Sequence, residues 1–443
     1  MSDPILTVPQ PGTSPDRSAR RSPLVERTLV EWDRRGVRWC VLRGAVTVTG
    51  AGEDVDLLVA PDDLRLAVAI AVAAGFAPLR GVGRGSHRFL LAYDQEGDVW
   101  VKLDVVTEAA FGRYLEYPIL AAASLLERRV GGPGARRLAP DDEFWALVLH
   151  CLLDKGEFAD KYRRTLRELA SVQPTAGGLG GAIGSLLPDR IAYCLHMAVR
   201  QGDWEQALGF AGEVRSAVRR TQPREVARRR LRNRGGRLVE RPILAWERRG
   251  PRVAVLGPDG AGKSTLIHGI ADNSLLPVRA VYMGLWARGR EADPGLLRSM
   301  VQVLLRPFRA WGRYLTGVMH SARGRLVLFD RYTYDAMIPA RPPYTWLKER
   351  YFWMLAHSCP SPDLVLVLDA PGAEMFRRKG EFDAAHLEVE RRHFLSVAER
   401  VPRSVLIDAT QPEEDVRREA LARVWAVQSR WLGRRIRRSV AGA

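Results

Sequence analysis

The chain has 443 residues, a length that fits two or three domains. Apolar residues make up 46% and charged residues 27%, which is a globular composition and excludes a wholly disordered or fibrous chain. The formal net charge is +17, but only six of the 68 basic residues are lysine. Because a GC-rich genome also produces such an arginine excess, the charge alone does not indicate nucleic-acid binding.

Four scattered cysteines without a C-x-x-C pair argue against a disulfide scaffold or a structural zinc site, and they indicate a reducing, cytoplasmic location. Residues 1–23 are rich in Pro, Ser and Arg, lack the order of a secretory signal, and predict a disordered tail. No uncharged apolar run reaches the roughly 18–20 residues of a transmembrane helix. Peripheral attachment to a membrane stays open, and the sequence does not fix the oligomeric state.

The first part of the chain has the pattern of a small mixed α/β domain over residues 24–130. Gly and Pro punctuation predicts two helices, and apolar runs predict four strands, the last two joined by a hairpin. The helices are expected at 24–35 and 62–75, and the strands at 37–42, 55–60, 88–93 and 99–106.

The middle of the chain predicts a helical domain over residues 131–235, followed by a basic linker at 236–250. Fourteen arginines lie between Arg215 and Arg252. They favour a solvated helix face and linker, although a surface for an anionic partner such as nucleic acid stays open.

The C-terminal part, residues 251–443, alternates strands with helices. Near-continuous apolar runs are typical of parallel strands buried on both faces, so a parallel sheet flanked by helices is expected here. The predicted strands are 252–257, 278–283, 325–330, 363–369 and 404–408.

A phosphate-binding loop follows the first of these strands and opens a predicted helix. The nine residues fit G-x-x-x-x-G-K-[ST] in full: Gly257, Pro258, Asp259, Gly260, Ala261, Gly262, Lys263, Ser264 and Thr265. Glycines let consecutive N–H groups turn toward phosphate oxygens at a helix N-terminus. Lys263 is expected to reach the β- and γ-phosphates and Ser264 to bind Mg²⁺, so the motif predicts ATP and Mg²⁺ as cofactors.

Two further segments suit phosphoryl transfer. Asp330 ends a strand beside the loop and can hold Mg²⁺ or its water, and Arg331 can pair with a second phosphate. Arg377, Arg378 and Lys379 lie on a segment that can close over the transferred group and neutralise its charge. A solvated basic helix is the alternative for this last segment.

These pieces resemble the thymidylate kinase family of P-loop nucleoside-monophosphate kinases over about residues 250–430. The resemblance covers the loop acid, Asp330-Arg331-Tyr332, the basic lid at 376–382, and the segment 408–416, which looks like the family's loop against the ATP base. It implies that Asp259 approaches the acceptor nucleotide and that Arg331 binds the acceptor phosphate. The segment 284–320, rich in Arg and Trp, is not an evident thymidine pocket. The acceptor is therefore a nucleoside monophosphate or another small phosphorylated or hydroxylated metabolite.

Three acids form a second candidate site in the N-terminal part. Asp54 and Asp56 alternate on one strand and share a face, and Asp104 lies on a later strand. Three close carboxylates repel one another unless a cation lies between them, so a Mg²⁺ site is expected. The pattern resembles the nucleotidyltransferase superfamily over about residues 37–106, with a turn at Gly44. An active enzyme, an inactive or binding-only version and an unrelated α/β unit all stay open.

We therefore expect a multidomain α/β protein whose C-terminal domain transfers a phosphoryl group from ATP to a small acceptor. A nucleotidyl-transfer site beside a kinase would suit activation of a metabolite by phosphorylation and then nucleotidyl attachment. The alternative is an ATP-driven switch or nucleic-acid-associated NTPase with an inactive nucleotidyltransferase-like domain. ATP turnover stimulated by a small acceptor, and not by DNA or RNA, distinguishes the first from the second.

Overall fold

The computed structural model describes residues 22–43, 54–171, 177–247, 249–285, 296–337, 339, 344–380 and 382–440. The chain divides into two compact units, residues 1–244 with 432–443, and residues 245–431. Each unit has its own sheet and its own buried core. The expected tail at 1–23 lies outside the described residues except for Ser22, which caps α1 (Pro23–Arg34), and Pro23, which begins it.

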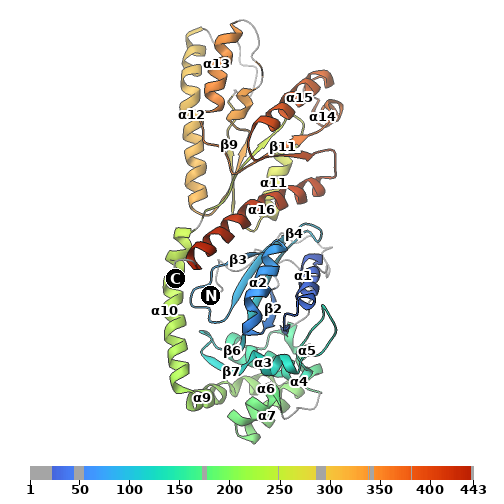
Figure 1. Cartoon of the computed structure of the whole chain (residues 1–443), viewed down its shortest axis with the longest axis vertical. Helices are drawn as coiled ribbons and strands as arrows, with labels where there is room; N and C mark the ends of the chain where they lie inside the picture. The colour runs from blue at the N-terminus through green and yellow to red at the C-terminus, as the bar shows by residue number, and fades with distance from the viewer. Residues whose placement is uncertain are drawn as a thin grey trace. The chain divides into compact units, whose positions relative to one another are not determined.

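The N-terminal unit contains a five-stranded mixed sheet in the order β1-β2-β5-β4-β3 (Figure 1). Only β2 and β5 are parallel neighbours. The strands are β1 (Trp39–Arg43), β2 (Asp54–Val59), β3 (Ala77–Leu79), β4 (Arg88–Asp94) and β5 (Val99–Val106). The apolar side chains of one sheet face pack with α1 and α2 (Leu64–Ala73), which follows a short 3-10 turn (Pro61–Asp63).

The opposite face of this sheet joins the helices of the middle segment in one core. Cys40, Leu42 and Leu58 belong to the same buried cluster as Phe144 and Leu195. The parts expected as separate domains, 24–130 and 131–235, therefore form one unit. Its remaining elements are β6 (Glu108–Phe111), β7 (Tyr117–Ala121), α3 (Ala122–Glu127), α4 (Pro140–Leu149), a π-helical turn (His150–Lys155), α5 (Asp160–Leu169), α6 (Gly178–Leu186), α7 (Asp189–Gln201), α8 (Trp204–Gly209) and α9 (Ala211–Thr221).

The segment expected as a linker is helical, because α10 (Pro223–Glu247) runs through most of 236–250. The second of its two consecutive glycines, Gly236, serves close packing. A Cβ on Gly236 would lie 2.6 Å from the Cα of Gly83, so only glycine permits this approach of two backbones. Glu240, one turn later, accepts hydrogen bonds from the Arg84 side chain, at 2.8 Å and 3.2 Å.

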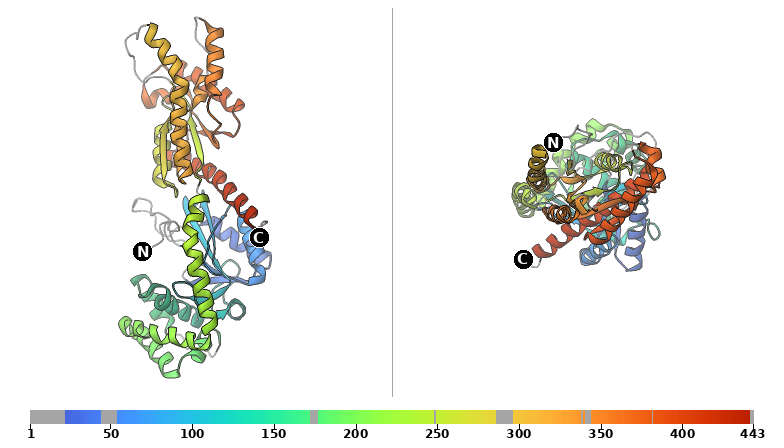
Figure 2. Two further views of the ribbon diagram at one scale, coloured as in Figure 1. Left: turned by 90° about the vertical axis from the view of Figure 1, so that its left-hand side faces the viewer. Right: turned by 90° about the horizontal axis from the view of Figure 1, so that it is seen from above.

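The C-terminal unit is a five-stranded parallel sheet in the order β12-β11-β8-β10-β9, with helices on both faces (Figures 1 and 2). All five predicted strands are present, as β8 (Arg252–Leu256), β9 (Val278–Tyr282), β10 (Leu326–Asp330), β11 (Leu364–Asp369) and β12 (Ser404–Asp408). The helices are α11 (Lys263–Asn273), α12 (Leu296–Ala322), α13 (Thr345–Ala356), α14 (Gly372–Lys379), α15 (Ala384–Arg400) and α16 (Glu413–Val440), with a 3-10 turn at Thr333–Met337. In such sheets ligands bind at the carboxyl ends of the strands.

Within the part of the chain that the structure describes, no helix is both long and apolar enough to cross a membrane.

Candidate functional site

The predicted phosphate-binding loop connects β8 to α11. Gly257, Gly260 and Gly262 have φ of 144°, 86° and 92°, a backbone region that residues with a Cβ rarely adopt. A Cβ on Gly260 would also lie 2.7 Å from the carbonyl oxygen of Met375. The glycines are therefore required by a tight turn that packs against α14.

A cavity of about 500 Å³ opens over this loop. The structure brings most of the predicted site residues to it: Asp259, Gly260, Ala261, Gly262, Lys263, Ser264, Thr265, Asp330, Arg378 and Lys379. Gly257, the first residue of the loop, is not among the described lining residues. Arg377 is not among the described lining residues; its side chain is 74% exposed and pairs with Glu374.

Lys263 is buried at the start of α11, where its ammonium group contacts the loop itself. Nζ donates to the carbonyl oxygens of Gly257 at 2.9 Å and Pro258 at 2.7 Å. Burial lowers the pKa of Lys263, and the nearby Arg331 lowers it further, while Asp259 opposes both. The ammonium group is thus fixed at the cavity that the loop encloses.

Arg331 directly follows β10 and has a left-handed backbone, with φ of 66°. Its guanidinium donates to Asp259 at 2.6 Å and lies 3.5 Å from Asp335. A non-glycine residue with positive φ is strained. Such strain is kept where the surrounding contacts hold the residue in place, often at functional sites. Burial would raise the pKa of Asp259, but Lys263 and Arg331 together hold it below its ordinary value.

Asp335 is a site residue that the sequence analysis missed. It lies in the 3-10 turn after β10 and is fully buried beside Arg331, and burial raises its pKa to about 6. The available signal was its position four residues after Arg331, in the turn that follows a strand end.

Helices α14 and α15 are each anchored by an arginine, one through a hydrogen bond and the other through an ion pair. Arg391 of α15 binds Asp369, at the end of β11, through two contacts of 2.6 Å and 3.1 Å. Arg378 donates to the carbonyl of Ala409 at 2.9 Å. This contact joins the end of α14 to the segment after β12, which also lines the cavity.

The donor set of the cavity fits a nucleoside triphosphate with Mg²⁺. Loop N–H groups and the Lys263 ammonium suit phosphate oxygens. The Ser264 hydroxyl and the Asp330 carboxylate, both in the lining, are oxygen ligands of the kind that Mg²⁺ prefers.

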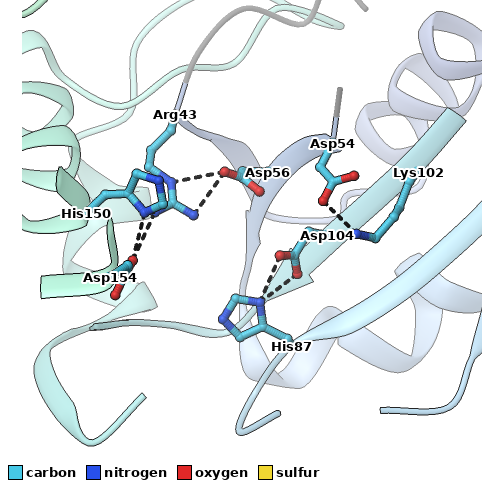
Figure 3. Close-up of polar contacts among 8 residues, drawn as sticks. All are labelled: Arg43, Asp54, Asp56, His87, Lys102, Asp104, His150 and Asp154. Carbon is cyan, nitrogen blue, oxygen red and sulfur yellow. Dashed lines mark hydrogen bonds and ion pairs between the residues drawn. The ribbon is translucent and has the colours of Figure 1, made fainter. Parts of the chain in front are cut away.

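The three acids of the N-terminal unit lie on one face of its sheet (Figure 3). Asp56 is in register with Asp104, and Asp54 with Lys102, on the parallel pair β2 and β5. Residues in register on neighbouring strands point to the same side of a sheet. The three acids therefore share a face of the sheet.

Each of these carboxylates contacts a basic side chain of the same unit. The contacts are Lys102 to Asp54 at 2.6 Å, Arg43 to Asp56 at 3.0 Å, and His87 to Asp104 at 2.7 Å. Among the described residues, no group of three or more His, Cys, Asp or Glu side chains is arranged to hold a metal. The expected Mg²⁺ site is thus not supported and stays a prediction.

Arg43 has two further polar partners besides Asp56. Its guanidinium also contacts His150 and lies 3.5 Å from Asp154, and His150 lies 2.7 Å from Asp154. Burial, with Arg43 adding to it, lowers the pKa of His150, so this ring is neutral near pH 7. The sequence analysis did not predict Arg43, His87 and Lys102 as partners of the three acids. A signal was available for Lys102, which lies two residues before Asp104 on the same strand. The expected turn at Gly44 lies outside the described residues.

No family model matches the chain, and no curated protein matches it. Among solved structures, one similar to this chain is a thymidylate kinase from Candida albicans, at 19% identity and a TM-score of 0.32. The match covers 39% of this chain and 89% of that one.

Proposed function

We propose that the C-terminal unit transfers the γ-phosphoryl group of ATP to a small acceptor in a Mg²⁺-dependent reaction. One observation carries this proposal: the phosphate-binding loop, Asp330 and the basic end of α14 line a single cavity. A loop that served only as a nucleotide-sensing switch would not require the two basic residues Arg378 and Lys379 at the same cavity.

On the donor side, Lys263 and the loop amides would bind the β- and γ-phosphates, and Ser264 and Asp330 would hold Mg²⁺. Bound there, Mg²⁺ neutralises charge on the phosphates. Lys263 is already fixed within the loop by the carbonyls of Gly257 and Pro258, so little reorientation is needed when phosphate binds. Arg378 and Lys379 would add positive charge around the transferred group.

On the acceptor side, Asp259 and Arg331 are held together by their 2.6 Å contact. The resemblance of this loop and of Asp330-Arg331-Tyr332 to thymidylate kinases assigns these residues to the acceptor. A nucleoside monophosphate, or another small phosphorylated or hydroxylated metabolite, is the acceptor class we propose. The guanidinium of Arg331 suits a phosphate on that acceptor.

The test is ATP turnover by the purified full chain against a panel of nucleoside monophosphates and sugar phosphates, with products identified by mass spectrometry. Turnover should rise with one acceptor class. Lys263→Ala should lower this transfer by at least about a thousandfold, because it removes preorganised charge from the transition state.

Lys161→Ala, at an exposed lysine in the N-terminal unit, is the matched control and should keep full activity. Undiminished transfer by a folded Lys263→Ala variant contradicts the assignment. Turnover that rises only with DNA or RNA supports the nucleic-acid-associated NTPase instead.

A further inference from the structure

The long helix α12 exposes a continuous apolar stripe. Ala310 and Tyr314 are buried against the sheet, so the opposite side of the helix faces outward. Positions on that side recur about every three or four residues. Six of them carry large exposed apolar side chains: Leu304, Leu305, Phe308, Trp311, Leu315 and Met319. Leu304 and Phe308 are 68% and 74% exposed, whereas the outward side of a surface helix usually carries polar residues.

The neighbouring helix α13 extends this apolar surface. Its Tyr351 hydroxyl donates to the carbonyl of Val303 on α12 at 2.6 Å, and Figures 1 and 2 show the two helices side by side. Trp346 and Trp353 are 63% and 67% exposed and lie seven residues apart, on one side of α13. We call these two tryptophans and the six residues of α12 the α12–α13 face.

The charge on α12 has one sign, whereas α13 carries the exposed Glu349 together with Lys348 and Arg350. Between Leu296 and Ala322 the sequence contains four arginines and no Asp or Glu. Arg309 is exposed, and Arg323 and Arg325 follow the end of the helix. Helices that lie in a membrane interface combine an apolar side rich in Trp, Phe and Leu with a basic polar side.

We propose that the α12–α13 face binds the surface of a bilayer that contains anionic lipids. The apolar side chains would enter the headgroup region, tryptophan would sit at the interface, and Arg309, Arg323 and Arg325 would contact lipid phosphates. A second copy of the chain is less suited to this face. A two-fold contact would bring the acid-free α12 of each copy together, arginine near arginine, whereas anionic headgroups supply the opposite charge. No residue of the phosphate-binding cavity belongs to the face, so this proposal stands apart from the proposed kinase activity.

The test is flotation of the full chain with two kinds of vesicle, phosphatidylcholine alone and phosphatidylcholine with about 30% phosphatidylglycerol. We expect binding to the anionic vesicles at least about tenfold tighter than to the neutral ones. Phe308→Glu should lower binding to anionic vesicles by at least about tenfold, because it places a carboxylate where an apolar side chain inserts. Tyr193→Glu, at a residue 65% exposed in the N-terminal unit, is the matched control and should bind like the wild type.

The charge component is tested separately with Arg309→Gln. Each arginine near an anionic surface contributes about fivefold to affinity, so this variant should bind anionic vesicles about fivefold more weakly. Arg224→Gln, at an exposed arginine of α10, should bind like the wild type. Trp353→Glu on α13 gives a second apolar variant should Phe308→Glu fail to fold.

Three outcomes would overturn the proposal. The first is no flotation with either vesicle. The second is equal binding by the wild type and by folded Phe308→Glu and Trp353→Glu. The third is a wild-type dimer, seen by sedimentation, that Phe308→Glu dissociates while vesicles bind neither form; the face would then join two copies. Because transfer to soluble acceptors is measured without vesicles, none of these outcomes affects the kinase assignment.

Discussion

At the scale of single residues, Arg331 has the most informative environment in the C-terminal unit. Its left-handed backbone and its contacts with Asp259 and Asp335 fix the guanidinium between two carboxylates. We expect Arg331→Ala to raise the acceptor KM by about tenfold or more and to leave ATP affinity nearly unchanged. Arg279→Ala, at an exposed arginine of β9, is the control and should change neither. Lower ATP affinity with unchanged acceptor kinetics would assign Arg331 to the donor.

Asp335 predicts a pH dependence of stability. Its pKa in the folded chain is about 6, against an ordinary value of 3.8, because burial disfavours the charged form. Between pH 4 and 6 the folded state therefore binds more protons than the unfolded state, so stability falls as pH rises through this window. The loss of stability over this window is about 3 kcal/mol at most.

Asp335→Asn should remove this fall, since an amide does not ionise. Urea denaturation of both forms from pH 4 to 7 measures it, with Asp272→Asn, at an exposed acid of α11, as the control. Parallel stability curves for the wild type and Asp335→Asn would show that folding does not raise the pKa of Asp335.

At the scale of helices and strands, the C-terminal sheet was predictable from the sequence. Its three central strands, β8, β10 and β11, are runs of buried apolar residues, a pattern that does not depend on distant contacts, whereas the edge strands β9 and β12 are partly exposed. In contrast, β3 has three residues, and the hairpin of β6 and β7 contains Pro118 and a register shift. Those strands are fixed by pairing with their neighbours, which a local pattern does not reveal.

The basic linker expected at 236–250 is mostly helical for a similar reason. Two consecutive glycines normally indicate a break in a helix. In α10, Gly236 instead lets the helix pack against the backbone at Gly83, and the long-range Arg84–Glu240 ion pair follows one turn later. Tertiary contact therefore overrides the local preference.

The candidate sites show the same division. The tight turn at 257–265 was predictable because its pattern lies in nine consecutive residues, and its phosphate-binding role stays a prediction. The partners of Asp54, Asp56 and Asp104 were not, because Arg43, His87 and Lys102 reach them from different strands and turns. The acids were visible in the sequence, whereas their neutralisation depends on the folded chain.

The loop itself gives a prediction at this scale. Gly260→Ala must adopt a positive φ and must also displace the backbone of Met375, whose oxygen would lie 2.7 Å from the new Cβ. Gly156→Ala is the matched control, since Gly156 has φ of 73° with nothing within 4 Å of a Cβ. Gly156→Ala should lower the free energy of unfolding by about 1–2 kcal/mol, from backbone strain alone.

Gly260→Ala should cost more than the control and should weaken ATP binding by about tenfold, because the loop and α14 move apart. Calorimetric titration with ATP and urea denaturation measure the two effects. Equal stability losses for the two variants, with unchanged ATP affinity, would show that the backbone at Met375 moves aside without a measurable loss of stability.

At the scale of the whole molecule, the two units differ in how their charges are used. The C-terminal unit keeps Lys379 and the loop amides at an open cavity. In the N-terminal unit the charged side chains on the sheet face bind one another, and that face continues into the core that holds the helices. This arrangement argues against an active nucleotidyl-transfer site at these three acids.

The last prediction separates a metal site from a network of ion pairs. Arg43 and Asp56 are 12% and 22% exposed, so Asp56→Asn leaves a nearly buried guanidinium without one of its carboxylate partners. We expect the unfolding free energy to fall by about 2 kcal/mol, equally with and without Mg²⁺. Asp62→Asn, at a side chain that is 91% exposed and only weakly paired with Arg38, should cost almost nothing. Phosphoryl transfer by the C-terminal unit should be the same in both variants.

A divalent-metal site at Asp54, Asp56 and Asp104 makes the opposite prediction. Mg²⁺ or Mn²⁺ would then stabilise the wild type, and Asp56→Asn would remove that stabilisation, so the two forms would differ most at high metal concentration. Titration of Mn²⁺ without nucleotide, followed by electron paramagnetic resonance, measures binding directly. Because Lys102 and Arg43 already supply positive charge to Asp54 and Asp56, and His87 contacts Asp104, we expect no Mn²⁺ bound there up to about 1 mM. Tight binding that Asp54→Asn and Asp56→Asn both abolish would show that metal displaces these basic side chains.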